Sequence, residues 1–248
     1  MQRNTGNCVT FLHGNRILSI HLSLIYFRAT TMISYNRNSN ILFLIVFLFA
    51  GHAATAQTRI ALLAGVQATT SRYHVRDMKQ STTFKPGFIV GAGCKLEFEK
   101  KLFFSPAVFY SYKGYKVVLD QAAYPPDIEA VKNNVSVHTL ELAPMLEYDF
   151  SLSAKHLFIK FGPSIDIQLY GREKISLISG NTVSRKMKYG FTEYGRYAGS
   201  AILQFGYQFN KDCFVQAYYS HGLADLNNAD NGPNIKYRTF GIAAGLFL

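Results

Sequence analysis

The stretch "KLEFEKKLFFSPAVFY" (residues 95–110) alternates apolar and polar side chains on both sides of a short charged break. Leu96 and Phe98 alternate with lysine and glutamate, and the alternation resumes with bulkier residues after Glu99-Lys100-Lys101. Because successive side chains of a strand point to opposite faces, the stretch predicts two strands joined by a tight turn. A soluble sheet and a membrane barrel both fit this pattern, so the rest of the chain has to distinguish them.

The composition favours amphipathic strands. Only 17% of the 248 residues are charged, below the roughly 25% that is usual in soluble domains. Phenylalanine (20) and tyrosine (16) are abundant, and the mean hydropathy is +0.03. A protein that spans the membrane with helices would be far more apolar, so that class is excluded.

The formal charge of +11 does not indicate a nucleic-acid partner. Four arginines lie within residues 1–56, and the other cations are scattered over strand ends and loops without a basic run. Cysteine occurs at Cys8, Cys94 and Cys213, which cannot form a disulfide framework. No Cys/His spacing resembles a zinc site, and we expect no metal and no cofactor.

Residues 1–56 are interpreted as an N-terminal extension and a secretory signal peptide. The apolar run "ILFLIVFLFA" (41–50) follows Arg37 and precedes the small-x-small site Ala54-Thr55-Ala56, which predicts cleavage before Gln57. The n-region fits better if translation starts at Met32 rather than at Met1. No cysteine stands at the cleavage site, which excludes a lipoprotein. The mature domain is then predicted to be residues 57–248.

The mature region contains eight segments with period-two alternation, each about as long as the roughly ten residues of a membrane-crossing strand. Short and long connections alternate, and the long ones are 70–86, 114–134, 170–193 and 223–235. This rhythm predicts an all-β fold, an eight-stranded antiparallel up-and-down transmembrane β-barrel with short periplasmic turns, outer loops and both termini in the periplasm. The predicted strands are 59–69, 87–99, 102–113, 135–149, 156–169, 194–209, 213–222 and 236–248.

Side-chain volume predicts which face points inward. One face of the strands is bulky and apolar, and the other is small or polar with occasional charges. The interior of an eight-stranded barrel is only wide enough for side chains to fill, so the bulky face should meet lipid. The inward charges predict a salt-bridge network that plugs the lumen, with a narrow ion path as the alternative. The predicted lumenal residues are Lys95, Glu97, Glu141, Glu147, Lys160, Asp166 and Arg196.

Aromatic residues cluster at both ends of the predicted strands, as expected for two interfacial girdles. Phe98, Tyr148, Phe150, Tyr207 and Phe209 lie near the short turns, and Tyr110, Tyr112, Tyr170, Tyr197 and Tyr219 lie toward the long loops. The prolines Pro106, Pro144 and Pro163 argue against regular strands, because proline cannot donate to a ladder. Each is therefore predicted to mark a bulge or a local break.

Four stretches resemble the PorT-like outer-membrane β-barrel family: "PGFIVGAGCKLEFEKKLFFSPAVFYSYKG" (86–114), "LELAPMLEY" (140–148), "LFIKFGPSIDI" (157–167) and "CFVQAYYSHGLADLN" (213–227). The resemblance covers residues 57–248 and implies a barrel in the outer membrane of a Gram-negative envelope. It also implies a role in protein secretion, which some relatives have. It carries no site residue.

The sequence contains no convincing catalytic constellation. Ser136 and His138 share a face that should point to lipid, and the neighbours Ser220 and His221 point to opposite faces. The loop cations are expected to contact lipopolysaccharide phosphates. These cations are Arg72, His74, Arg76, Lys79, Lys85, Arg172, Lys174, Arg185, Lys186 and Lys188.

The predicted function is that of a non-enzymatic envelope protein with a structural or accessory role in secretion, transport or surface interaction. The alternatives are a small-solute channel, a rim-active lipid-modifying enzyme and a periplasmic lipocalin-like carrier. Expected partners are outer-membrane lipid, lipopolysaccharide and envelope secretion proteins. The apolar last strand, ending at Phe247-Leu248, also predicts contact with the barrel-insertion machinery.

Overall fold

The computed structural model describes residues 58–120, 129–230 and 232–248. The predicted extension, the apolar run 41–50 and the cleavage site after Ala56 lie outside these ranges. Among the described residues, no helix is long and apolar enough to cross a membrane. The strands are β1 (Arg59–Val75), β2 (Met78–Lys79), β3 (Ser81–Glu99), β4 (Leu102–Phe104), β5 (Ala107–Val118), β6 (Ala130–Ala143), β7 (Leu146–Asp149), β8 (His156–Leu177), β9 (Thr182–Lys186), β10 (Tyr197–Gln208), β11 (Cys213–Gly222) and β12 (Asn234–Phe247).

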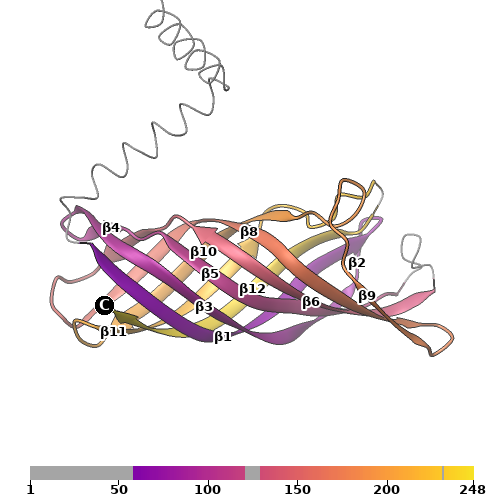
Figure 1. Ribbon diagram of the computed structural model, residues 1–248, viewed down its shortest axis with the longest axis horizontal. Helices are drawn as coiled ribbons and strands as arrows, with labels where there is room; N and C mark the ends of the chain where they lie inside the picture. The colour runs from indigo at the N-terminus through magenta and orange to yellow at the C-terminus, as the bar shows by residue number, and fades with distance from the viewer. Residues whose placement is uncertain (1–57, 121–128, 231) are drawn as a thin grey trace, which may run out of the picture. The chain divides into compact units, whose positions relative to one another are not determined.

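The strands close into an antiparallel ring in the order β1-β3-β5-β6-β8-β10-β11-β12. β1 pairs with β12 on one side and with β3 on the other, so the ring of eight strands is closed (Figure 1). The short strands β4 and β7 continue the courses of β5 and β6 and pair with each other. The eight-stranded up-and-down barrel predicted from the sequence is therefore confirmed.

Several strands are longer than the sequence predicted. The predicted loop 70–86 is a hairpin: β1 runs to Val75, and a two-residue turn with positive φ at Arg76 (47°) and Asp77 (67°) leads into β2. The predicted loop 170–193 holds the outer part of β8 and its hairpin partner β9. The alternation continues past the expected membrane boundary, with polar side chains replacing apolar ones on the outer face. The two rims are called here the short-turn end and the long-loop end.

The three in-strand prolines lie side by side in one row. The strand registers place Pro106 opposite Pro144 and Pro144 opposite Pro163. The Ser105 N–H donates to the Met145 carbonyl, so Ser105 and Met145 are a hydrogen-bonded pair. Opposite residues of an antiparallel ladder alternate between hydrogen-bonded and non-hydrogen-bonded pairs, so the next pair, Pro106 and Pro144, needs no hydrogen bond between its members. Pro106 and Pro144 fall in the breaks between β4 and β5 and between β6 and β7, as predicted, whereas Pro163 sits within the continuous β8.

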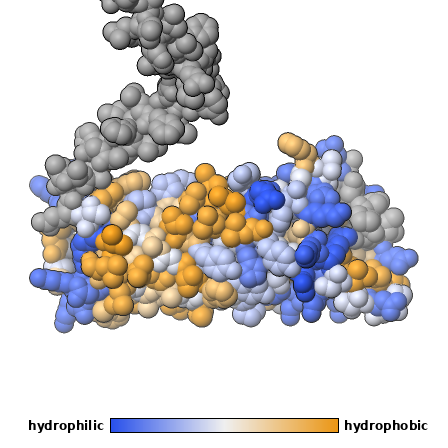
Figure 2. All heavy atoms as spheres, viewed as in Figure 1, coloured by the Kyte–Doolittle hydropathy of each residue, from blue (hydrophilic) through white to orange (hydrophobic). Residues whose placement is uncertain are grey.

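The outer wall is apolar in a broad band, which Figure 2 shows. Side chains such as Ile60, Val66, Phe161 and Ile242 are half or more exposed there. The apolar face thus points outward, the reverse of the lipocalin-like arrangement. The predicted girdle residues lie on this outer face, with ring contacts such as Tyr148 to Phe150 and Tyr207 to Phe209.

The inner face holds more aromatic rings than the sequence suggested. Each of several inward rings lies over a glycine on the neighbouring strand, where a Cβ atom would come within 2.4 Å of the ring. The missing side chains of these glycines therefore leave room for the inward rings, which would not fit against a strand with a side chain at every position. The cross-strand partners are Phe109 and Gly91, Phe158 and Gly206, Phe214 and Gly245, and Tyr218 and Gly241.

Candidate functional site in the lumen and at the long-loop end

An ion-pair cluster fills the lumen near the short-turn end. Lys95 Nζ lies 2.7 Å from Glu147 Oε1 and 2.6 Å from Asp149 Oδ2. Lys160 Nζ reaches the other oxygen of Glu147 at 2.8 Å, and His156 Nε2 lies 3.1 Å from Asp149 Oδ2. All five side chains are buried, so each charge has its counter-charge inside the barrel.

A second cluster lies deeper in the barrel. Lys113 Nζ contacts Glu141 Oε1 and Asp166 Oδ2, each at 2.8 Å. Ser164 donates to the other oxygen of Asp166 at 2.6 Å. A neutral chain runs beside it: Tyr218 donates to Gln67, which in turn donates to Ser111. The charged groups of this cluster thus have partners inside the lumen.

The structure places five of the seven predicted lumenal residues in these two clusters, namely Lys95, Glu141, Glu147, Lys160 and Asp166. The other two predictions need correction. Glu97 has the inward parity but is exposed at the short-turn rim, because the packed lumen ends below it. Arg196 is exposed before the start of β10 and lies over the Tyr189 ring, 5.3 Å from its centroid.

Three cluster members were missed: Lys113, Asp149 and His156. Lys113 has the same parity as the inward Phe109 and Ser111, and that signal was present in the sequence. Asp149 and His156 flank the short connection between β7 and β8, where alternation alone does not tell lumen from turn.

Apolar layers separate and cover the charged clusters. Phe109, Met145, Ile202 and Tyr218 pack together at mid-height, and Phe158, Phe214 and Phe247 pack toward the short-turn end. Two cavities that border the mid-height layer, one on the side of the short-turn layer and one on the side of Lys113, have volumes of about 10 Å³ each. A cavity of that size holds about one water molecule, which is too little for a continuous water path.

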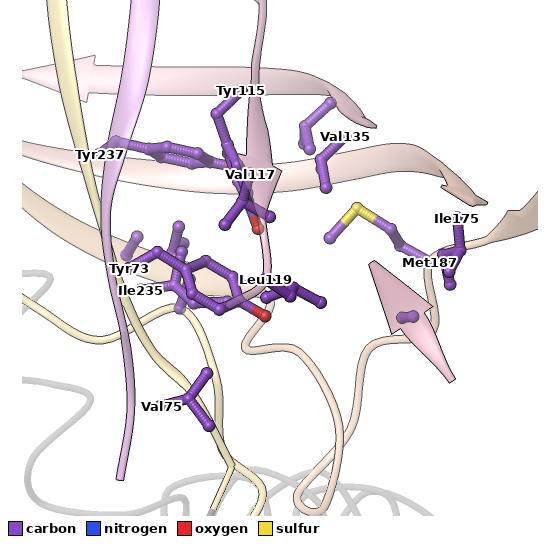
Figure 3. Close-up of a cluster of buried hydrophobic side chains, with 14 residues drawn as sticks. Tyr73, Val75, Tyr115, Val117, Leu119, Val135, Ile175, Met187, Ile235 and Tyr237 are labelled. Carbon is purple, nitrogen blue, oxygen red and sulfur yellow. The ribbon is translucent and has the colours of Figure 1, made fainter. Parts of the chain in front are cut away.

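A much larger cavity, about 670 Å³, opens at the long-loop end. Its base is apolar, formed by Tyr73, Leu119, Ile175 and Met187, which Figure 3 shows within a larger buried cluster. Cations and polar residues of the β8–β9 hairpin and the loop after it form its rim. A concave, mainly apolar cavity of this size with a few polar groups is typical of a ligand site.

Glu173 is the buried charge of this cavity. Its carboxylate accepts hydrogen bonds from Asn133 at 2.9 Å, Arg185 at 2.8 Å and Tyr194 at 2.6 Å. Burial, and secondarily the charge of Glu173, raises the pKa of Tyr194 well above its usual range, so the hydroxyl remains a donor. The three donors lock Glu173, which therefore fixes the cavity wall rather than offering a free base.

The outward Ser136 and His138 have separate hydrogen-bond partners. Both lie on the outer face, as predicted. Ser136 Oγ accepts from Lys85 Nζ at 2.5 Å, while His138 Nδ1 shares a 2.6 Å hydrogen bond with Tyr110. Lys85 Nζ also donates to Asn134 Oδ1 and to the Val135 carbonyl, as an ammonium with three acceptors does. Lys85 is thus a hydrogen-bond donor to Ser136 in this structure, and His138 has Tyr110 as its partner.

The predicted loop cations fall into separate groups. Arg185, Lys186 and Lys188 line the cavity at the long-loop end, and Arg185 is committed to Glu173. Lys85, Arg172 and Lys174 lie on the outer wall instead. Lys186 belongs to both groups, because it borders the cavity rim and also pairs with the outward Arg172 in the sheet. Among the described residues, no group of three or more His, Cys, Asp or Glu side chains could hold a metal ion.

Comparison with known proteins gives one family and several weak structural similarities. The family described as "Outer membrane protein beta-barrel domain" matches residues 55–228, which span β1 to β11. A search of curated proteins found no matching sequence. Ail of Yersinia pestis, in a crystal structure with the heparin analogue sucrose octasulfate, is 12% identical with a TM-score of 0.41, covering 77% of this chain and 99% of Ail.

Two further solved structures are similar to the same degree. Neisserial surface protein A is 12% identical with a TM-score of 0.40, over 75% of this chain and 96% of that protein. OprG of Pseudomonas aeruginosa is 11% identical with a TM-score of 0.40, over 77% of this chain and 96% of OprG. The family match spans more than half of the chain, whereas the structural similarities are at the level of the fold.

Proposed function

Because this chain belongs to the outer membrane protein beta-barrel domain family, we propose that it is a non-enzymatic barrel with a structural or accessory role in the outer membrane. The role is in envelope transport and secretion or in surface interaction. The filled lumen carries this proposal: two buried ion-pair clusters and the aromatic layers between them occupy the space that a channel would need. The PorT-like resemblance of residues 57–248 supports the secretion role.

The proposed orientation has the short turns and both termini in the periplasm, after cleavage following Ala56. The short turns and long hairpins of the barrel support it, since outer-membrane barrels have short periplasmic turns and longer outer loops. In this orientation the cavity of about 670 Å³ opens to the cell exterior, which favours surface interaction.

Planar-bilayer recording tests the sealed lumen against the channel alternative. The intact protein is expected to give no steady single-channel current, because its lumenal cavities hold about one water each. A porin on the same bilayer is the positive control. Steady currents that fall in Glu141→Gln, but not in Lys188→Gln outside the packed lumen, would show a conducting path and contradict the proposal.

Capture of partners tests the accessory role. Cross-linking in native membranes through the long-loop end is expected to recover envelope proteins in a fixed ratio to the barrel. The same cross-linker placed on the apolar band is the control, since lipid covers that surface. Recovery of the same proteins from both positions would indicate proximity alone and contradict a specific partner.

A further inference from the structure

The outer wall carries a group of cations between the apolar band and the long-loop end. We call it the basic face and define it as Lys85, Lys116, Lys132, Arg172, Lys174 and Lys186. Lys116 and Lys132 were not among the cations predicted from the sequence to contact lipid. Figure 2 shows hydrophilic residues gathered in this region, beside the apolar band.

The strand register brings these side chains together. In one row of the sheet Lys116 pairs with Asn134, which pairs with Lys174. In the next row Ser136 pairs with Arg172, which pairs with Lys186 on β9. Neighbouring strands are about 4.8 Å apart, so adjacent rows present several cations within about 10 Å of one another.

Lys85 is built into the middle of this surface. A register shift between Phe84 and Phe88 turns its side chain outward, and it crosses β5 at Gly114. A Cβ atom at Gly114 would lie 3.1 Å from Lys85 Cδ and 2.1 Å from the Val135 carbonyl oxygen. The ammonium then donates to three acceptors on β6. The cation is held in a fixed position on the wall rather than extended into solvent.

The acids within the described strands β6 and β8 do not neutralise this surface. Glu141, Asp166 and Glu173 all point into the barrel, where they have their own partners. Like charges on one face repel each other unless an anion lies between them. The charge arrangement therefore calls for an external anion.

The position of the basic face indicates where that anion comes from. The row next to it on the membrane side is Tyr112, His138 and Tyr170, whose rings contact one another on the outer face. Aromatic residues of this kind mark the level of lipid headgroups. Beyond them lie Val108, Leu142 and Ile165 of the apolar band. A molecule bound to the basic face thus has its acyl chains beside the band.

We infer that the basic face binds the phosphate groups of lipopolysaccharide in the leaflet that borders the long-loop end. Lysines supply point charges and Arg172 a bidentate donor, both suited to phosphate. Six cations spread over five strands suit a ligand with more than one phosphate. The identity of the lipid rests on the proposed orientation, which places the long-loop end in the outer leaflet.

The test measures binding of purified lipopolysaccharide to the full barrel refolded in neutral detergent. The triple variant Lys116→Gln/Arg172→Gln/Lys174→Gln is expected to bind on the order of 10- to 100-fold more weakly, because each cation near a charged lipid surface contributes to attraction. The variant Lys100→Gln/Lys155→Gln/Lys211→Gln removes the same charge from the short-turn end and is expected to bind like the parent. Heat-modifiable gel migration confirms that both fold.

Two further arms identify the ligand chemistry. Phosphatase-treated lipopolysaccharide is expected to bind the parent as weakly as intact lipopolysaccharide binds the triple variant. Inorganic phosphate at the same phosphate concentration is expected not to displace the lipid. The inference would be overturned if the triple variant bound lipopolysaccharide as tightly as the parent, or if the short-turn control variant lost as much affinity as the triple variant. It would also be overturned if the dephosphorylated lipid bound tightly, or if free phosphate displaced the lipid. None of these outcomes bears on the sealed lumen, so failure here leaves the proposed function intact.

Discussion

Lys113 shows how one residue organises the interior of the barrel. Its ammonium lies between two carboxylates that come from different strands, Glu141 on β6 and Asp166 on β8. Burying any of these charges alone would be costly, and the arrangement is stable because they are buried together. Lys116, three residues further along β5, has the opposite parity and lies exposed on the outer wall. The same residue type thus has two different roles within one strand.

The substitution Lys113→Met is therefore expected to destabilise the barrel by about 3–5 kcal/mol, the range for breaking a buried ion pair by removing one partner. Glu141 and Asp166 would remain buried without their counter-ion. Urea unfolding of the refolded protein in lipid vesicles measures the change. Lys116→Met is the matched control and is expected to unfold like the parent. Equal unfolding midpoints for the two variants would show that the lumenal pairs do not stabilise the fold.

Gly114 on β5 allows a contact between two other strands, because the Lys85 side chain from β3 crosses β5 at Gly114 to reach its acceptors on β6. Its position requires the absence of a Cβ atom, which would meet the Val135 carbonyl oxygen at 2.1 Å. Gly199 on β10 is also a strand glycine, but the nearest atom to its Cβ position is Ala224 Cβ at 4.0 Å. Comparing the two glycines therefore distinguishes the cost of a steric clash, expected only at Gly114, from the general effect of replacing a strand glycine, expected at both positions.

We expect Gly114→Ala to cost about 1–3 kcal/mol of unfolding free energy, as overpacking of a well-packed site does. Gly199→Ala is expected to be neutral or slightly stabilising, since glycine weakens a strand interior. The two variants are compared by urea unfolding and by lipopolysaccharide binding, because Gly114→Ala should also displace Lys85 from the basic face. A Gly114→Ala protein as stable as Gly199→Ala would contradict the close approach of the strands.

The strands and their faces follow from the sequence because period-two alternation is a local property. "KLEFEKKLFFSPAVFY" (95–110) was predicted as a hairpin, and β3 and β4 confirm it, with Lys95 inward and Leu96 outward. Strand ends were not predictable, because polar alternation continues beyond the membrane as far as Val75 and Leu177. The partners of each lumenal charge depend on register between strands distant in sequence, which composition and spacing do not encode.

Proline illustrates the same limit. The sequence showed three prolines at odds with their strands, but their alignment in one row emerges only when three strands are paired. Because Ser105 and Met145 form the hydrogen-bonded pair beside them, Pro106 and Pro144 form a non-hydrogen-bonded pair, in which neither residue has to donate to the other. Tertiary pairing thus explains a pattern that each strand alone does not.

For the molecule as a whole, charge is separated by the barrel wall. The buried acids of the lumen and the cavity are paired with lysine or arginine, as in Lys95 with Glu147 and Arg185 with Glu173. Many of the exposed cations stand on the outside, and those of the basic face lie toward the long-loop end. The described cations on the outer wall near the long-loop end are thus placed where they can meet anionic lipid.

The orientation of the barrel decides which lipid leaflet and which compartment these surfaces meet, and epitope insertion tests it. A short tag after Gly180, at the exposed tip of the β8–β9 hairpin where φ is +82°, is expected to be labelled by antibody on intact cells. A tag after Ser153, in the exposed short turn before β8, is expected to be labelled only after the outer membrane is permeabilised. Both sites lie in turns that bury little backbone, so both insertions should be tolerated.

Heat-modifiable gel migration of each tagged protein shows that the barrel has formed. A periplasmic protein that its own antibody fails to label on intact cells shows that the outer membrane has remained intact. Labelling of the Ser153 tag on intact cells, with the Gly180 tag protected, would reverse the orientation. The cavity at the long-loop end would then face the periplasm, and the basic face would meet the phospholipid of the inner leaflet instead of lipopolysaccharide. The packing of the lumen would be unaffected, because its ion pairs do not depend on which rim faces outward.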